Sequence, residues 1–313
     1  MRVERIAIPR GLPMRLVSQA AAAVALCFLA AIPAAAATLD RIQESGHLRL
    51  GYLADLSPFS YRGKSGAAEG YSVALCQEVA EQVRTQLRRP DLVVDWVEVA
   101  PDDRLREVQA GSIDLLCVPT SATLHRRQEV SFSIPIFAGG VRAAVRADSA
   151  AALREALSDA PPQRPVWRGS PAAKLIEKTT FAVASGTTAE SWLARKLDSF
   201  QIEAETVKVP DFRTGLQQLM DGKVDVLFGE RSAMLGAMDE ASMRKVAIFP
   251  RLFTHEPLSL ALARGDDDFR LLVDRALSGF YSSADFPKAY GKWFGDFDEA
   301  TRTFFLWSTP PPE

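Results

Sequence analysis

The sequence predicts an α/β protein that contains two units of similar plan. Residues 48–118 alternate between short apolar runs and stretches with helical periodicity, in the order β-α-β-α-β. The same alternation returns between residues 181 and 228. This order is typical of a mostly parallel sheet with helices on its faces. Removing residues 1–37 from the 313-residue chain leaves 276 residues, which suit two compact units better than one.

Residues 1–37 precede the first element and have the composition of a secretory signal peptide. Arginines give a basic start, residues 16–32 are mostly apolar, and an Ala-rich end supplies the small residues that a signal peptidase requires. The alternative is a membrane anchor, because the apolar part approaches the length of a thin span. The alanines that follow Pro33 favour cleavage near Ala37. We therefore expect an exported protein, and no later run is long and apolar enough to span a bilayer.

The first unit begins with an alternating strand at residues 48–53. A helix that starts at Ser72 then carries apolar residues at helical spacing as far as Leu87. The remaining elements are strands at 92–97 and 113–118, separated by a short helix over 102–110. Ligands of parallel sheets bind at the carboxyl ends of the strands, so the loops after Leu53 and Val118 are candidate binding loops.

The second unit follows a strand at 141–145 and a stretch, 148–178, whose four prolines predict irregular structure. Its elements are strands at 181–184, 202–209 and 224–228, a helix that opens at 186–190 and runs through Leu197, and a helix over 212–220. After these come a strand at 258–262 and a helix capped by Asp266. The apolar stripe of that last helix is expected to pack against a sheet.

Charge and composition limit the classes of function. Removal of the leader changes the formal net charge from −2 to −5, and an acidic chain without basic blocks argues against nucleic acid as a partner. The histidines, His47, His125 and His255, are scattered, so no metal site is indicated. The chain has no nucleophile elbow and no phosphate loop. We expect neither a cofactor nor an enzyme from these patterns.

Two cysteines, Cys76 and Cys117, remain after Cys27 is lost with the leader. Outside the cytoplasm such a pair is more often bridged than free, so we predict a disulfide between them. The alternative is a pair of buried thiols.

Polar side chains follow the strand at 113–118 and begin a candidate binding site. Ser121 and Arg126 leave the strand end together, and a guanidinium beside hydroxyl groups can hold a carboxylate by parallel charge-assisted bonds. Thr187 and Thr188 open a helix of the second unit, where free N–H groups and a partial positive charge suit an anion. Ordinary turn and capping roles are the alternative for both segments.

Glu230 lies just beyond the strand at 224–228, where a carboxylate would bind an ammonium group. The alternative is an exposed ion pair with Arg231. An anion-binding segment together with a facing carboxylate predicts a site for a zwitterion. Because the parts come from both units, such a ligand would bind between them and favour closure.

Short motifs along the chain, taken in order, resemble the periplasmic solute-binding proteins of polar amino acid ABC transporters, in the group of the glutamate/aspartate binders. The resemblance extends from about Leu39 to the end of the chain. Its motifs occupy residues 39–46, 58–61, 70–72, 104 with 111–114, 120–133, 186–188, 222–225 and 292–295. As an ordered set they are specific for the family, although not for one ligand.

The resemblance implies the two-lobed type II periplasmic binding protein fold, with two hinge strands between the lobes. Residues 38–138 and 256–313 would form the first lobe, and residues 141–253 the second. It implies a monomer without cofactor that captures a free amino acid in the periplasm and delivers it to the permease subunits of an ABC transporter in the inner membrane.

The resemblance also assigns roles to the site residues. Ser121 and Arg126 would bind the ligand α-carboxylate, together with the backbone N–H groups of Thr187 and Thr188. Glu230 stands where the family has an aspartate that binds the α-ammonium group. The carbonyl of Pro119 or of Ser121 would complete the ammonium shell, and the implied side-chain pocket consists of Leu53, Leu56, Tyr61, Arg104 and Phe212.

Two positions of that pocket bear on specificity. Acidic-amino-acid binders of this group carry an arginine where this chain has Leu53, whereas Arg104 is kept. The pocket is therefore expected to be less suited to a second carboxylate, and the sequence does not name the amino acid. The alternative function is a periplasmic dehydratase acting on prephenate-like acids, since such enzymes resemble these binders and Glu230 could serve as general acid.

Overall fold

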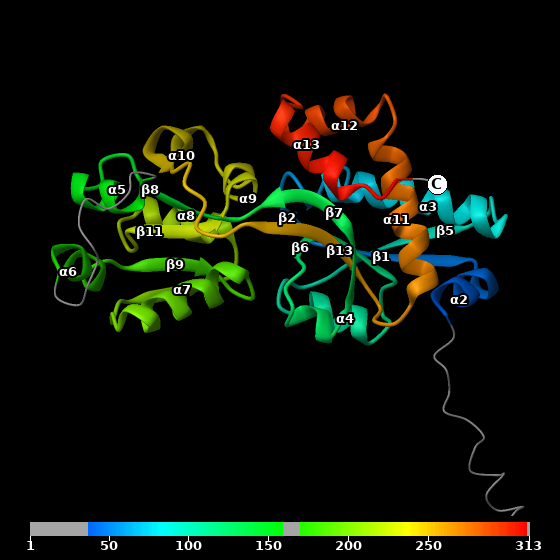
Figure 1. Cartoon of the computed structure of the whole chain (residues 1–313), viewed down its shortest axis with the longest axis horizontal. Coiled ribbons are helices and arrows are strands. Elements are labelled where there is room, and N and C mark those ends of the chain that lie inside the picture. The colour runs from blue at the N-terminus through cyan, green and yellow to red at the C-terminus, as the bar shows by residue number, and fades with distance from the viewer. Residues whose placement is uncertain (1–36, 159–169, 312–313) are drawn as a thin grey trace, which may run out of the picture. The chain divides into compact units, whose positions relative to one another are not determined.

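The computed structural model describes residues 37–158 and 170–311, in which two five-stranded sheets carry helices on both faces (Figure 1). The predicted signal peptide, apart from Ala37, lies outside the described residues. No helix of the described part is long and apolar enough to cross a membrane. The α/β class predicted from the alternating pattern is confirmed.

The first sheet has the strand order β5-β1-β6-β13-β7. Its strands are β1 (His47–Tyr52), β5 (Val93–Glu98), β6 (Leu115–Ser121), β7 (Ser131–Gly139) and β13 (Glu256–Leu262). The first three are parallel, and β13 runs antiparallel to both β6 and β7. A small separate sheet consists of β2 (Asp55–Leu56), β3 (Ser60–Arg62) and β4 (Ala68–Glu69).

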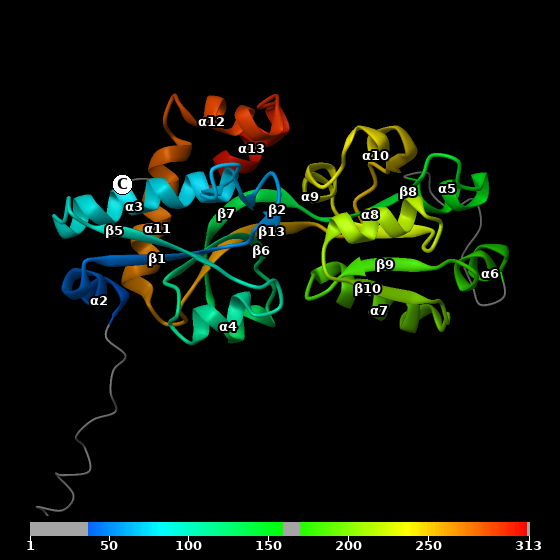
Figure 2. The same ribbon diagram turned by 180° about the vertical axis from the view of Figure 1, so that it is seen from behind.

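Helices cover both faces of the first sheet because its strands are apolar on both faces. They are α2 (Thr38–Ser45), α3 (Tyr71–Leu87), α4 (Arg104–Gln109), α11 (Asp267–Tyr281), α12 (Phe286–Phe294) and α13 (Glu299–Ser308). Successive side chains of a strand point to opposite faces, so Leu115 and Cys117 of β6 pack with α3 and α11, whereas Leu116 packs on the face of α4. Figure 2 shows α3 and α4 on opposite sides of this sheet.

The second sheet repeats this plan in the order β10-β9-β11-β8-β12. Its strands are β8 (Val141–Arg146), β9 (Phe181–Ala184), β10 (Thr206–Val209), β11 (Val226–Glu230) and β12 (Val246–Ile248). Its helices are α5 (Ala151–Leu157), α6 (Pro171–Glu177), α7 (Thr188–Phe200), α8 (Phe212–Met220), α9 (Arg231–Gly236) and α10 (Glu240–Lys245). Val183 of β9 packs with Leu193 of α7, and the neighbouring Ala182 packs with Leu216 of α8 on the other face.

Two chain segments connect the sheets, and they are bonded to each other. The first passes from β7 through Gly140 into β8, and the second returns through Thr254 into β13. The N–H of Val141 donates to Oγ1 of Thr254 (2.9 Å), and the N–H of Phe253 donates to the carbonyl of Val141 (2.9 Å). A Cβ at Gly140 would collide with the carbonyl oxygen of Thr254, so this close approach requires glycine. Figure 1 shows the two segments running side by side.

The structure corrects the prediction that residues 148–178 are irregular. Helices α5 and α6 occupy most of the described part, and residues 159–169 lie outside the description. Pro171 begins α6, where a missing N–H costs no helical hydrogen bond. Oγ of Ser170 caps the helix by accepting from the N–H of Ala173 (3.1 Å). The proline therefore marks a helix start rather than a break.

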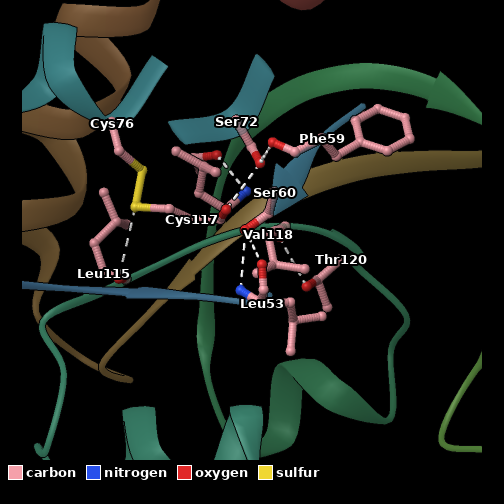
Figure 3. The surroundings of a disulfide bond; sticks show 11 residues. Leu53, Phe59, Ser60, Ser72, Cys76, Leu115, Cys117, Val118 and Thr120 are labelled. Carbon is pink, nitrogen blue, oxygen red and sulfur yellow. Dashed lines mark hydrogen bonds between the residues drawn. A yellow bond between two sulfur atoms is a disulfide. The ribbon is translucent and has the colours of Figure 1, made fainter. Parts of the chain in front are cut away.

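The predicted disulfide between Cys76 and Cys117 is confirmed and joins α3 to β6 (Figure 3). Both residues are fully buried, and their Cα atoms are 6.0 Å apart. Oγ of Ser72 lies 2.8 Å from the carbonyl oxygens of Phe59 and Cys117, one turn before Cys76 on the same helix. The bond and this hydroxyl fix α3 on the strand that leads into Ser121.

Candidate functional site

The parallel strands of both sheets direct their carboxyl ends to one cavity of about 610 Å³. This volume lies within the range of small-molecule sites. The predicted site residues that line the cavity are Leu53, Leu56, Arg104, Pro119, Ser121, Arg126, Thr187, Thr188, Phe212 and Glu230. Tyr61 is not among the lining residues: its hydroxyl lies 3.4 Å from the Glu69 carboxylate and its ring packs edge-on against Trp293.

The guanidinium of Arg126 is held in place by two backbone carbonyls. It donates to the carbonyl of Ser121 (3.2 Å) and, across to the second sheet's side of the cavity, to the carbonyl of Gly186 (2.9 Å). Among the described residues these bonds use two of its five N–H donors, so the fork keeps donors for a ligand. Burial lowers the pKa of Arg126, and the charge of Glu256 opposes that effect.

Arg104 converges on the same carbonyl from α4. It donates to the carbonyls of Pro101 and Gly186, the latter at 2.9 Å. Burial, followed by the positive charge of Arg126, lowers the pKa of Arg104 to about 10. Gly186 has φ +68°, in the left-handed region that favours glycine. Two cations therefore lie close together at the rim, a position that an anion would stabilise.

The first turn of α7 supplies further donors. Thr187 is the residue before the helix, and its hydroxyl is used locally, donating to the carbonyl of Ala184 (2.7 Å). The first N–H groups of a helix have no intrahelical acceptor, so those that follow Thr187 are available to an anion. The hydroxyl of Thr188 donates to the carboxylate of Glu256 (2.6 Å).

Glu256 is a cavity residue that the sequence did not reveal. Its Oε2 atom accepts from the hydroxyls of Ser121 and Thr188, and its Oε1 atom accepts from the hydroxyl of Thr254 (2.6 Å). The sequence placed the strand at 258–262, which left Glu256 outside any element. Its position follows from the antiparallel pairing in which Leu258 of β13 opposes Ser121 of β6. An acid two residues before that predicted strand was the available signal.

Glu230 ends β11 and caps α9. Its Oε2 atom accepts from the N–H of Ala233 (2.8 Å), which accounts for an acid at this position. Burial raises the pKa of the Glu230 carboxyl, and the N–H groups of Ala233 and Ser232 are the strongest opposing influence. The charges of Arg142 and then Arg231 oppose it to a smaller extent. The residue is thus a partly buried cap that lines the cavity rather than an exposed ion pair.

The remaining wall of the cavity is largely apolar. Leu53 is fixed by its backbone N–H, which donates to Oγ of Ser60 (2.9 Å). Phe212 begins α8, and a Cβ at Gly229 would collide with its ring, so β11 and α8 approach closely here. The ionisable lining residues comprise five carboxylates and two arginines. This balance is unfavourable for a ligand with a strong excess of negative charge.

A second rim contact lies at Gly236, the last residue of α9. A Cβ at this position would collide with the carbonyl oxygen of Ser57, which precedes Pro58 in the loop between β2 and β3. Contacts between residues of the two sheet regions therefore occur at Gly186 and at Gly236. These two contacts lie at the rim of the cavity and connect the two sheet regions there.

Comparison with known proteins identifies relatives over most of the chain. The family model of the bacterial extracellular solute-binding proteins, family 3, matches residues 48–296. The L-glutamate/L-aspartate-binding protein of Pseudomonas aeruginosa is 27% identical over 261 residues, which cover 82% of this chain and 80% of that protein. The cyclohexadienyl dehydratase of the same organism is 30% identical over 216 residues, which cover 67% of this chain and 68% of that enzyme.

A solved structure shows the fold. The ancestral amino acid-binding protein AncCDT-1, a precursor of cyclohexadienyl dehydratase, has a TM-score of 0.65 and 24% identity, covering 83% of this chain and all of its own. The predicted type II periplasmic binding protein fold is thereby confirmed.

Proposed function

The chain belongs to the bacterial extracellular solute-binding proteins, family 3, and we propose that it captures a free amino acid and delivers it to an ABC permease. The observation that carries this proposal is the cavity at the strand ends of both sheets. It brings Arg126 and the N-terminus of α7 together with the carboxyl of Glu230. A cavity with these groups offers opposite partners to the two charges of a zwitterion.

The proposed mechanism is closure of two lobes around the ligand. Residues 38–138 and 256–313 form one lobe, residues 141–253 form the other, and the bonded segments at Gly140 and Thr254 are the hinge. A ligand that contacts both lobes only in the closed form stabilises that form by its differential affinity. The permease then recognises the closed, loaded protein.

In the proposed site, Arg126 binds the α-carboxylate with the first N–H groups of α7. Glu230 and the carbonyl of Pro119 accept from the α-ammonium group. Leu53, Leu56, Arg104 and Phe212 contact the ligand side chain. The apolar wall and the excess of carboxylates favour a ligand without a second negative charge, although Glu/Asp binders are among the relatives.

The proposed location is the periplasm, after removal of residues 1–37 near Ala37. The partners are the free amino acid and the permease subunits in the inner membrane. The protein acts as a monomer without cofactor or nucleic acid, and it is not an enzyme.

A thermal-shift screen of the mature protein against the twenty amino acids and prephenate tests the function. A ligand at 100 times its dissociation constant adds about 2.7 kcal/mol of stability, which raises the melting temperature measurably. We expect a rise with one amino acid or a small group of similar ones. A rise with prephenate alone would contradict the transport function.

The second candidate function is a dehydratase. It is favoured by the raised pKa of the Glu230 carboxyl and by the 30% identity to cyclohexadienyl dehydratase. A general acid must hold its proton until a hydroxyl group departs, whereas an ammonium-binding carboxylate must be ionised. The protonation state of Glu230 in the complex therefore separates the two functions.

We predict that amino acid binding releases protons from Glu230. Its raised pKa means that the ligand-free protein keeps the proton to a higher pH than a free glutamate does, and a bound ammonium group lowers that pKa. The release should be measurable by calorimetry in buffers of different ionisation enthalpy, and it should fall as the pH rises above the pKa. Glu230→Gln should release none. Proton release that is equal in both proteins would refute the assignment.

Gly236→Ala should weaken binding without altering the cavity, because Gly236 does not line it. The added methyl group collides with the Ser57 carbonyl when the lobes are closed. Overpacking of this kind costs about 1–3 kcal/mol, which is roughly a 5- to 150-fold loss of affinity if the contact forms only on closure. Gly279→Ala, in the open on α11, is the matched control and should bind as the wild type does. Equal affinities in both variants would show that this contact plays no part in closure.

A further inference from the structure

Glu256 has the surroundings that the proposed function assigns to a ligand carboxylate. Its Oε2 atom accepts from Oγ of Ser121 on β6 and from Oγ1 of Thr188 on α7, and its Oε1 atom accepts from Oγ1 of Thr254. Its negative charge acts on Arg126, since it partly offsets the effect of burial on the pKa of that residue. A carboxylate of the protein thus uses the donors of the site.

These contacts exclude a second carboxylate from the same hydroxyl groups. A hydroxyl has one proton to donate, so Ser121 and Thr188 have none left for a ligand while both donate to Glu256. A ligand carboxylate placed beside Glu256 would also be repelled by its charge. The carboxylate of Glu256 and that of a ligand therefore compete for one position.

The contacts of Glu256 also join the two sheet regions. The residue begins β13 of the first sheet, and Thr188 begins α7, which packs on the second sheet. The hydrogen bond from Thr188 to Glu256 (2.6 Å) therefore links the two regions. The hydrogen bonds of Arg104 and Arg126 to the Gly186 carbonyl link the same two regions.

We propose that Glu256 is an internal competitor for the ligand carboxylate. Whenever the ligand-free protein closes, Glu256 fills the carboxylate position and bridges the two regions, and the incoming carboxylate displaces it. This inference rests on the proposed function for the class of ligand. Displacement of Glu256 leaves the hydroxyls of Ser121 and Thr188 without an acceptor and Arg126 without a negative partner. Only a ligand with its own carboxylate supplies both, so Glu256 becomes a determinant of specificity.

The test compares Glu256→Gln and Glu256→Ala with the wild type. Each protein is titrated by calorimetry with each of the twenty amino acids. Both variants should bind the wild-type ligand at least fivefold more tightly, because the competing charge is gone. Glu44→Gln is the matched control: it makes the same change at an exposed position of α2, outside the cavity lining, and should change the affinity by less than twofold.

Two results would overturn the proposal. A loss of affinity in Glu256→Gln as large as that of Arg126→Ala would mean that Glu256 contacts the ligand directly. Unchanged affinity in both Glu256 variants would mean that it takes no part in binding.

The bridge is tested separately, without any ligand, by small-angle X-ray scattering. Glu256→Ala and Thr188→Val should increase the radius of gyration of the ligand-free protein, and Glu44→Gln should not. If no amino acid binds the wild type, the proposed function is contradicted, whereas the bridge is still tested by this measurement. An unchanged radius in Glu256→Ala and Thr188→Val would overturn it.

Discussion

Arg126→Ala is expected to abolish most amino acid binding. Arg126, like Arg104, contacts both sides of the cavity rim, and burial has already removed part of its hydration. Loss of one partner from a desolvated charge pair costs about 2–5 kcal/mol, which corresponds to a decrease of roughly 30-fold to several thousand-fold in affinity. Calorimetric titration with the amino acid identified by thermal shift measures the effect.

The neighbouring Arg127 provides the control for this prediction. It is exposed, packs over the ring of Phe132, and does not line the cavity. Arg127→Ala removes the same charge one residue away and should leave the affinity within about threefold of the wild type, as expected for a screened surface charge. Near-normal binding by Arg126→Ala would show that Arg126 does not bind the ligand carboxylate.

Replacement of both Cys76 and Cys117 by alanine is expected to lower the free energy of unfolding by roughly 3–4 kcal/mol. The bridge closes a loop with a sequence separation of 41 residues, and the chain-entropy argument gives a stabilisation of that order. Denaturant unfolding at equilibrium measures the difference. The affinity for the amino acid should be almost unchanged, because neither cysteine lines the cavity.

A reducing agent supplies the control for the disulfide. It should lower the free energy of unfolding of the wild type to about that of the double variant, and it should leave the double variant unaffected. Two free thiols per chain in denatured, unreduced mature protein would show that the bond does not form in solution.

Local patterns in the sequence predicted most of the elements. The strand at 181–184 and the helix at 212–220 have the predicted bounds, since each is delimited by residues with a local role. Asp211, for example, caps α8 by accepting from the N–H of Thr214 (2.7 Å). The stretch with several prolines was misread for the same local reason, because a proline that starts a helix and one that ends it look alike without the flanking structure.

The parts of the site that the sequence missed depend on contacts between distant residues. Glu256 reaches Ser121 only through the antiparallel pairing of β13 with β6, and sequence periodicity does not report which strands pair. Tyr61 was included in the pocket from its motif, but β3 pairs with β4 and brings its hydroxyl towards Glu69. Leu53, Pro119 and Ser121 line the cavity as expected, because the position of residues at the ends of parallel strands follows from the fold class.

The most direct test of the account is a crystal structure of the mature protein with the amino acid that gives the largest thermal shift. We predict that the ligand lies in the cavity with its α-carboxylate on the guanidinium of Arg126 and the first N–H groups of α7, and its ammonium group on Glu230. Glu256 should have left the hydroxyls of Ser121 and Thr188. A ligand bound elsewhere, or in the reverse orientation with its ammonium group at Arg126, would contradict the account.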